Sequence, residues 1–291
     1  FSAGYIYLTR YCASITIEFL KKLMKKDRLF TFGCSHTLYH WPTWADMIGL
    51  DYKNHYNFGH PGLGNFAIYN KVIKAIDHFN VTKEDTILIC LSSWDRVDYF
   101  NETGYWEGIG GLTGNEANRL FGETFVKNHI TNSAYEIEKV FTYVKSIQLI
   151  LDSIGCKYKI KNAFACHHRD ITDTPLKKIE SICDGFDSLY IKNKDMSDKS
   201  YMTYDLNGNL RMDGHLTIKE HLRFVKESFT EFYNEKNNDK ILEWETHISK
   251  SSLDINMYFK PRYWTFESNA LQHYRLKENP ELPSEKIRNI L

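Results

Sequence analysis

The stretch Thr86-Ile-Leu-Ile-Cys-Leu91, which follows Asp85, decides the fold class. It lacks the alternation of polar and apolar residues that a half-buried strand has. A strand that is apolar on both faces suits the centre of a parallel sheet covered by helices on both sides. The stretch therefore predicts a central parallel strand, and we expect helices and strands to alternate along the chain around it.

The segments on either side of this strand follow that alternation. Short apolar runs that end at turn residues predict further strands over 28–33, 55–58, 157–164 and 188–191. Apolar residues at helical spacing predict helices over 41–48, from Asn65 onward as its cap, and over 133–153, 175–183 and 217–232. Segments 101–130 and 193–216 are expected to be irregular loops. This order predicts a three-layer α/β/α sandwich with a parallel sheet, flavodoxin-like in build.

One domain over 24–235 accommodates these elements. A chain of 291 residues, 42% of them apolar, is long enough to bury a core of this size. Residues 1–23 are expected to be an N-terminal extension, because Met24 stands just before the first strand. Residues 236–291 are expected to form a helical or irregular C-terminal arm, whose aromatic residues favour docking on the body or on a partner.

Charge and cysteine spacing argue against several classes of protein. Lys and Arg total 37, as do Asp and Glu, so we expect no attraction to nucleic acid or to an anionic membrane. No apolar run reaches the length of a membrane helix, and residues 1–23 lack the features of a signal peptide. The six cysteines show no CxxC spacing, which is typical of reduced, buried thiols and predicts a cytoplasmic protein.

The sequence also predicts no cofactor and no metal. It contains no Walker loop and no Gly-x-Gly-x-x-Gly after a strand. Cys166, His167 and His168 carry atoms that bind metals, but adjacent histidines at a strand end rarely converge on one ion. We expect this segment to line the rim of a cleft instead.

A serine follows the first predicted strand in Phe32-Gly33-Cys34-Ser35-His36-Thr37. A turn between a strand and a helix presents its side chains at the carboxyl end of a parallel sheet, where ligand sites of α/β proteins lie. The backbone N–H groups of such a turn are also able to hold an oxyanion. Gly-x-Ser-x-Thr is equally typical of an ordinary helix-capping turn, so this motif alone leaves both interpretations open.

A histidine with a nearby carboxylate lies late in the chain, in Asp213-Gly214-His215. A serine nucleophile needs a base within hydrogen-bonding reach, and the base needs a group that orients its ring. Asp213 stands two residues before His215 in a loop where Gly214 permits a tight turn. The alternative is a solvated loop whose polar residues cap the following helix.

Together these segments resemble the SGNH (GDSL-like) hydrolase family. Gly33-Cys34-Ser35 is similar to its first block, Asn57-Phe58-Gly59-His60-Pro61-Gly62 to its second, and Asp213-Gly214-His215 to its last. The resemblance implies a serine esterase in which Ser35 is the nucleophile, His215 the base and Asp213 its orienting carboxylate. It also implies that the N–H groups of Ser35 and Gly62 form the oxyanion hole.

The third block departs from the family pattern, since Ser92-Ser93-Trp94-Asp95-Arg96 has Trp94 where the family has an asparagine donor. Ser93 or Asn65 is a candidate substitute for that donor. Loss of one oxyanion donor typically costs about 10²–10³ in rate. Of the neighbouring residues, we expect four to contact substrate: His36, Trp94, Asp95 and Arg96. Arg96 is a candidate clamp for a substrate anion, although an ion pair that shapes the loop explains it equally well.

The resemblance implies hydrolysis of small acyl esters, such as acetyl esters on a carbohydrate, without a cofactor. Two alternatives remain open. The missing asparagine favours a binding or structural module of the same fold with weak or no turnover. The same residues would also serve an O-acyltransferase that transfers the acyl group to a sugar instead of to water.

Overall fold

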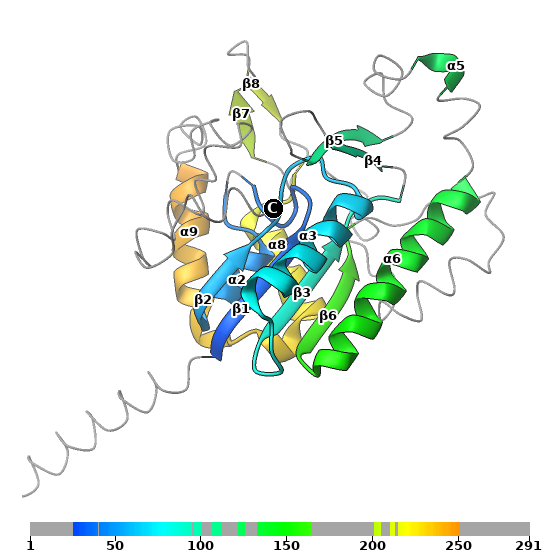
Figure 1. Ribbon diagram of the computed structural model, residues 1–291. Coiled ribbons are helices and arrows are strands. Elements are labelled where there is room, and N and C mark those ends of the chain that lie inside the picture. The colour runs from blue at the N-terminus through cyan, green and yellow to red at the C-terminus, as the bar shows by residue number, and fades with distance from the viewer. Residues whose placement is uncertain are drawn as a thin grey trace, which may run out of the picture.

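The computed structural model describes residues 26–39, 41–94, 96–100, 106–111, 122–125, 133–163, 201–204, 210–212 and 215–250. Four parallel strands in the order β2-β1-β3-β6 form the central sheet of this part of the chain (Figure 1). Their bounds are β1 (Lys26–Gly33), β2 (Tyr52–Asn57), β3 (Thr86–Leu91) and β6 (Lys157–Asn162). The expected strand at 188–191 and the expected helix at 175–183 lie outside the described residues.

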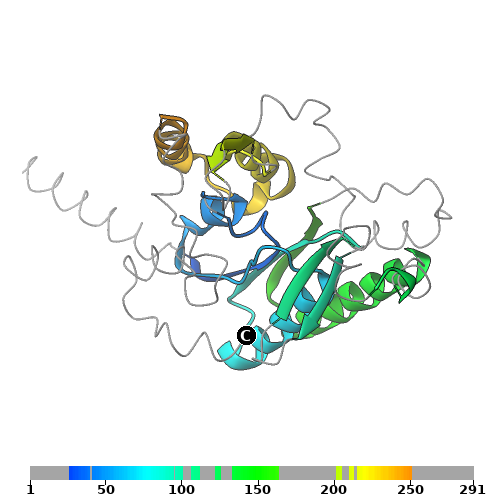
Figure 2. The same cartoon turned by 90° about the horizontal axis from the view of Figure 1, so that it is seen from above.

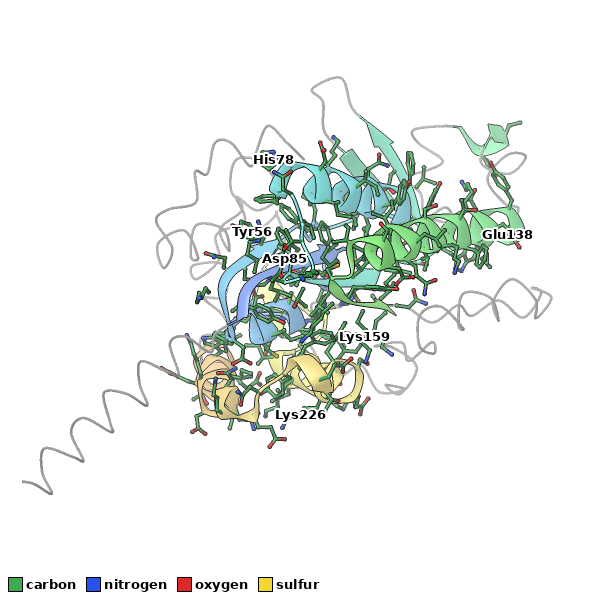
Figure 3. The ribbon with its side chains drawn as sticks, turned by 60° about the horizontal axis from the view of Figure 1, so that its bottom comes forward. Tyr56, His78, Asp85, Glu138, Lys159 and Lys226 are labelled. Carbon is green, nitrogen blue, oxygen red and sulfur yellow. The ribbon has the colours of Figure 1, made fainter. Side chains whose placement is uncertain are left out.

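Helices cover both faces of this sheet. α3 (Asn65–Phe79) and α6 (Ser133–Ile154) lie on one face, and α2 (Trp44–Gly49), α8 (Ile218–Ser228) and α9 (Asn238–Lys250) lie on the other (Figure 2). Glu138 of α6 and Lys226 of α8 mark the opposite outer surfaces (Figure 3). The three-layer α/β fold with a parallel sheet that the sequence predicts is therefore confirmed.

The central strand explains why its sequence is apolar throughout. Leu88 and Cys90 of β3 belong to the buried cluster beneath α2, α8 and α9, while Ile87 and Ile89 belong to the cluster beneath α3 and α6. All residues of β3 are buried, so each face of the strand contributes to a different core. Burial of one such aliphatic side chain typically contributes about 1.5–3 kcal/mol.

Helix α9 is part of this body. Ile241 and Ile248 are buried in the same cluster as Trp44 of α2, and the Tyr201 hydroxyl donates a hydrogen bond to the Glu245 carboxylate. The single turns η2 (Thr230–Phe232) and η3 (Glu235–Asn237) connect α8 to α9. Residues 251–291 lie outside the described residues.

Two β-hairpins add strands that the sequence did not predict. β4 (Arg96–Phe100) pairs with β5 (Trp106–Gly111), and β7 (Met202–Tyr204) pairs with β8 (Leu210–Met212), both antiparallel. A short helix, α5 (Glu123–Phe125), follows β5. The expectation of irregular structure over 101–130 and 193–216 was wrong at β5, β7 and β8, because strands this short carry little periodic apolar signal, and β4 lies just before the first of these segments.

The cap of α3 also differs from the expectation. The residue at the N-cap is Gly64, which has no side chain, and Asn65 is already the first helical residue. The carboxylate of Asp98 in β4 accepts the hydrogen bonds from the first turn instead. Asn65 was a wrong prediction for this role because its amide bonds the end of β3.

Candidate active site

Ser35 lies in a tight turn at the carboxyl end of β1. The N–H groups of Thr37 and Leu38 donate to the carbonyl of Cys34 at 2.9 and 3.3 Å, which closes the turn around Ser35 and His36. A Cβ atom at Gly33 would lie 2.0 Å from the Thr37 Oγ1 atom and 2.7 Å from the Cys90 carbonyl, so only glycine fits there. The chain places β2 on one side of β1 and β3 on the other, so the order of strand addition reverses between β1 and β3. Ligand sites of parallel sheets lie at the carboxyl ends of the strands at such a point.

The glycine-rich segment 57–64 is bonded to this turn. The Asn57 amide donates to the Thr37 carbonyl at 2.9 Å, and the Gly59 N–H donates to the Asn57 Oδ1 atom at 3.0 Å. The His60 N–H donates to the Gly33 carbonyl at 3.1 Å. The backbone at Gly62 has φ of +82°, a conformation that favours glycine. The predicted first and second blocks therefore meet at one edge of the sheet.

The backbone donors expected to hold an oxyanion make no hydrogen bond within the described part of the chain. Neither the Ser35 N–H nor the Gly62 N–H donates to any acceptor in the described part of the chain. Backbone N–H groups at loops of this kind normally bond backbone, side chains or water. Both therefore remain available for a ligand oxygen.

His215 is brought to the same turn from the far end of the chain. Its ring stacks on the Tyr39 ring with 3.7 Å between centroids, and 5.3 Å separates its centroid from that of His36. The Trp41 Nε1–H donates to the carbonyl of Leu216 at 2.7 Å, a contact that spans 175 residues of sequence. The segment that ends the Ser35 turn thus holds the residue that follows His215.

Two members of the expected site lie outside the described residues, namely Asp213 and Asp95. Among the residues that are described, the Ser35 hydroxyl makes no hydrogen bond, and its side chain is only 3% exposed. Catalytic hydrogen bonds often tighten only when substrate binds. The contact from Ser35 to His215 and from His215 to Asp213 therefore stays a prediction.

Two further histidines are buried beside His215. Burial lowers the pKa of His36, and the nearby charges of His215, His221 and Arg96 lower it further. Burial, followed by the charge of His215, lowers the pKa of His221 in α8 to about 3. Both rings are therefore neutral at pH 7 and add no positive charge beside His215. No motif marks His221, since one histidine on the apolar face of a helix is usually a core residue.

The two substitutes for the missing asparagine donor differ in their surroundings. The Asn65 amide nitrogen donates to the carbonyls of Ser92 and Ser93 at 3.0 and 3.4 Å, and its Oδ1 atom accepts from the Ser92 N–H at 2.8 Å. These bonds hold the end of β3 against the first turn of α3. The Asn65 amide donors are thus already engaged. Ser93 is half-buried in the loop after β3, and its carbonyl accepts from the Asn65 amide and from the Arg96 N–H.

Asp98 secures the other end of the glycine-rich segment. Its carboxylate accepts from the Gly64 N–H at 2.6 Å and from the Ala67 N–H at 2.9 Å. Burial raises the pKa of Asp98 to about 6, while these hydrogen bonds and the charge of Arg96 oppose the rise. No sequence motif marks Asp98 for this role, because a cap supplied by a different element leaves no local signal.

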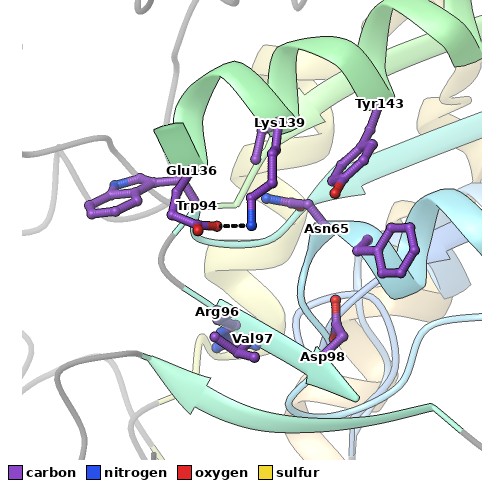
Figure 4. Close-up of a pocket in the computed structure, with 10 residues that line it drawn as sticks. Asn65, Trp94, Arg96, Val97, Asp98, Glu136, Lys139 and Tyr143 are labelled. Carbon is purple, nitrogen blue, oxygen red and sulfur yellow. Dashed lines mark ion pairs between the residues drawn. The ribbon is translucent and has the colours of Figure 1, made fainter. Parts of the chain in front are cut away.

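A pocket of about 100 Å³ lies between the first turn of α3, β4 and α6 (Figure 4). Two of the residues expected to bind substrate, Trp94 and Arg96, line it. Trp94 also packs on the core beneath α3 and α6, and Arg96 Nη1–H donates to the Leu63 carbonyl at 3.3 Å. The pocket therefore adjoins the segment that carries Gly62.

For metal ligands and membrane helices, the structure speaks only of the described residues. Within them, no three side chains of His, Cys, Asp or Glu cluster as metal ligands would, and Cys166, His167 and His168 lie outside. No helix in this part of the chain has the length and apolarity to cross a membrane. Cys34, Cys90 and Cys156 are buried free thiols.

Comparisons with known proteins add little. No protein-family model matches the chain, and no curated protein matches it significantly. Among solved structures, the chain is similar to a GDSL-like lipase from Bacteroides thetaiotaomicron, with a TM-score of 0.33 and 12% sequence identity. The match covers 71% of this chain and 87% of that one. A TM-score and a sequence identity this low bear on neither the activity nor the site residues.

Proposed function

We propose that the protein is a serine hydrolase that cleaves small acyl esters through an acyl-enzyme. The observation that carries the proposal is the convergence of three distant segments: the Ser35 turn, the segment with Gly62, and the segment with His215. A hydroxyl, two unoccupied N–H donors and an imidazole at one edge of a parallel sheet are the groups that acyl transfer needs.

In the proposed reaction the Ser35 Oγ atom attacks the ester carbonyl carbon while His215 accepts the hydroxyl proton. The carbonyl oxygen becomes an oxyanion and accepts hydrogen bonds from the N–H groups of Ser35 and Gly62. When the tetrahedral intermediate collapses, the bond to the alcohol breaks and His215 returns its proton to the leaving oxygen. Water then gives a proton to His215 and attacks the acyl carbon, the bond from that carbon to Ser35 Oγ breaks, and His215 returns the proton to Ser35 as the acid leaves. Asp213 orients the His215 ring throughout.

The proposed oxyanion hole has two backbone donors, with Ser93 as a candidate third. The Asn65 amide would have to give up its bonds to the β3 end before it reached an oxyanion. We therefore expect turnover to be modest, since one missing donor typically costs about 10²–10³ in kcat. The proposed substrates are acetyl or similarly small esters, for example on a carbohydrate.

The decisive experiment measures turnover of p-nitrophenyl acetate by the wild-type protein and by Ser35→Ala. We expect the substitution to remove nearly all catalysis, a loss of about 10³-fold or more if the triad acts as a unit. Ser153→Ala is the matched control, since Ser153 is exposed near the end of α6. A fluorophosphonate should add its phosphonyl group to Ser35, detected by peptide mass spectrometry. Wild-type turnover no faster than that of Ser35→Ala would end the proposal.

A binding module of the same fold is the second candidate. The engaged Asn65 amide favours it, as does the absence of a hydrogen bond from the Ser35 hydroxyl to any described residue. It predicts that the chain retains ester ligands without releasing acid, and that fluorophosphonate leaves Ser35 unmodified. Transfer to a sugar, the third alternative, is separated from hydrolysis by product analysis with a sugar acceptor present.

A further inference from the structure

The pocket between α3, β4 and α6 presents polar groups from three elements around one opening. Tyr143 and the pair Glu136–Lys139 come from α6, Asp98 from β4 and Asn65 from α3 (Figure 4). The ion pair joins Lys139 Nζ to Glu136 Oε2 at 2.6 Å. The Tyr143 hydroxyl makes no hydrogen bond to any described residue, so this group is able to donate and accept a hydrogen bond at the pocket wall.

The charges of this pocket balance. Arg96 and Lys139 are matched by Asp98 and Glu136, and the charge of Arg96 counteracts the rise in the pKa of Asp98. The two carboxylates would repel an anionic ligand, and the two positive charges would repel a cationic one. The balance therefore favours a neutral ligand that both donates and accepts hydrogen bonds.

Aromatic rings form the remaining wall. Phe66 is 40% exposed and lies against the Tyr143 ring with 5.4 Å between centroids, and Tyr69, which does not line the pocket, stacks on the Tyr143 ring at 5.3 Å. Trp94 lines the pocket as well. Aromatic faces pack well on the C–H faces of a saturated ring. A cavity of about 150 Å³ holds benzene, so this open pocket of about 100 Å³ suits part of one six-membered ring.

We infer that this pocket binds the alcohol portion of the substrate as a neutral, hydroxyl-bearing sugar ring. The inference rests on the proposed function only for the identity of that ring as the leaving alcohol. Arg96 links the two sites, because it lines the pocket, bonds the carbonyl next to Gly62 and lies within electrostatic reach of His36. For hydrolysis, a sugar held here must extend its ester group past Arg96 to the Ser35 turn.

The test is direct binding to the Ser35→Ala variant, which cannot turn substrate over. Isothermal titration with methyl β-glucopyranoside and methyl β-galactopyranoside should give a dissociation constant in the millimolar range for at least one. Tyr143→Phe should weaken binding about fivefold to tenfold, the effect of one hydrogen bond, and Glu136→Gln should weaken it as well. Tyr158→Phe, which removes a hydroxyl bonded to Asp152, should leave binding unchanged.

Other outcomes overturn the inference. Absence of binding by both glycosides, binding that is insensitive to Tyr143→Phe and Glu136→Gln, or tighter binding of the methyl glucuronide anion would each exclude a neutral sugar site. The result is independent of catalysis. Glycoside binding without ester turnover by the wild type would support the sugar-binding pocket and overturn the proposed hydrolase activity. Turnover of p-nitrophenyl acetate without glycoside binding would support the hydrolase activity and overturn the sugar-binding pocket.

Kinetics connect the two sites. For an acetylated methyl glucoside, Tyr143→Phe should raise KM with little change in kcat, because the hydroxyl binds the sugar in substrate and transition state alike. For p-nitrophenyl acetate, whose leaving group has no sugar hydroxyl for Tyr143 to bond, KM should rise less than for the acetylated glucoside. Equal effects on the two substrates would contradict a sugar-binding role for Tyr143.

Discussion

The Asp98 carboxylate accepts a 2.6 Å hydrogen bond from the N–H of Gly64, which lies 34 residues earlier in the chain. A second bond, from the Ala67 N–H at 2.9 Å, makes Asp98 the cap of α3 although it belongs to a different element. Gly64 permits this contact because a Cβ atom there would lie 2.7 Å from Asp98 Oδ2. The position of the segment that carries Gly62 therefore depends on a side chain of β4.

Asp98→Ala should destabilise the protein and lower its activity. Loss of a helix cap and of two bonds to a carboxylate typically costs about 1–3 kcal/mol. The loosened segment should lower kcat for p-nitrophenyl acetate more than it raises KM, because Gly62 is proposed to act in the transition state. Urea unfolding and steady-state kinetics measure the two effects. Asp77→Asn, an exposed change near the end of α3, is the control. Unchanged stability in Asp98→Ala would contradict the capping role.

The raised pKa of Asp98 predicts a pH dependence of stability. Its pKa is about 6 in the folded protein against an ordinary value of 3.8, so the folded state binds this proton more tightly than the unfolded state. The free energy of unfolding contributed by Asp98 is therefore highest below pH 4 and falls as pH rises toward 6. Asp98→Asn should remove this slope, measured by urea unfolding at several pH values. An identical slope in wild type and Asp98→Asn would assign the dependence to other groups.

Trp41→Phe should displace His215. The substitution removes the Nε1–H that bonds the Leu216 carbonyl and leaves a buried acceptor without its partner. We expect a loss of about 1–3 kcal/mol in stability and a fall in kcat of roughly tenfold, because small displacements of a base are costly. Trp44→Phe is a matched control, since Trp44 is also fully buried but its Nε1–H bonds no described residue. Equal effects of both variants on kcat would show that Trp41 acts only through packing.

Gly33→Ala should destabilise the Ser35 turn. The new methyl group would meet Thr37 Oγ1 and the Cys90 carbonyl, and crowding of this kind in a packed core costs about 1–3 kcal/mol. Gly155→Ala provides the comparison. Gly155 has φ of +74° but no atom closer than 3.9 Å to the added Cβ, so only backbone strain of about 1–2 kcal/mol applies. Both variants should have a lower thermal midpoint than the wild type. Ester turnover separates them, because only Gly33→Ala alters the Ser35 turn and should reduce it.

The sequence by itself determined the layers of this protein. The run Thr86–Leu91 predicts a doubly covered strand because each of its faces enters a different core. Helical spacing predicts α3 and α6 for the same reason, since burial imposes a local period on apolar residues. Gly33 before Ser35 marks the turn, because a position with no room for a Cβ atom requires glycine and is therefore visible in the sequence. The bounds of β3 match the prediction, and α6 ends one residue later than predicted.

Only the tertiary structure decided which groups meet. The Asp98 cap, the bond from Trp41 to Leu216 and the engagement of the Asn65 amide each join residues far apart in the chain. Such contacts follow from the directions of individual side chains and have no period along the sequence. The hairpin of β4 and β5, which carries Asp98 and Arg96 to the pocket, was missed for the same reason. Local burial sets the elements of this fold, whereas long-range hydrogen bonds set its site.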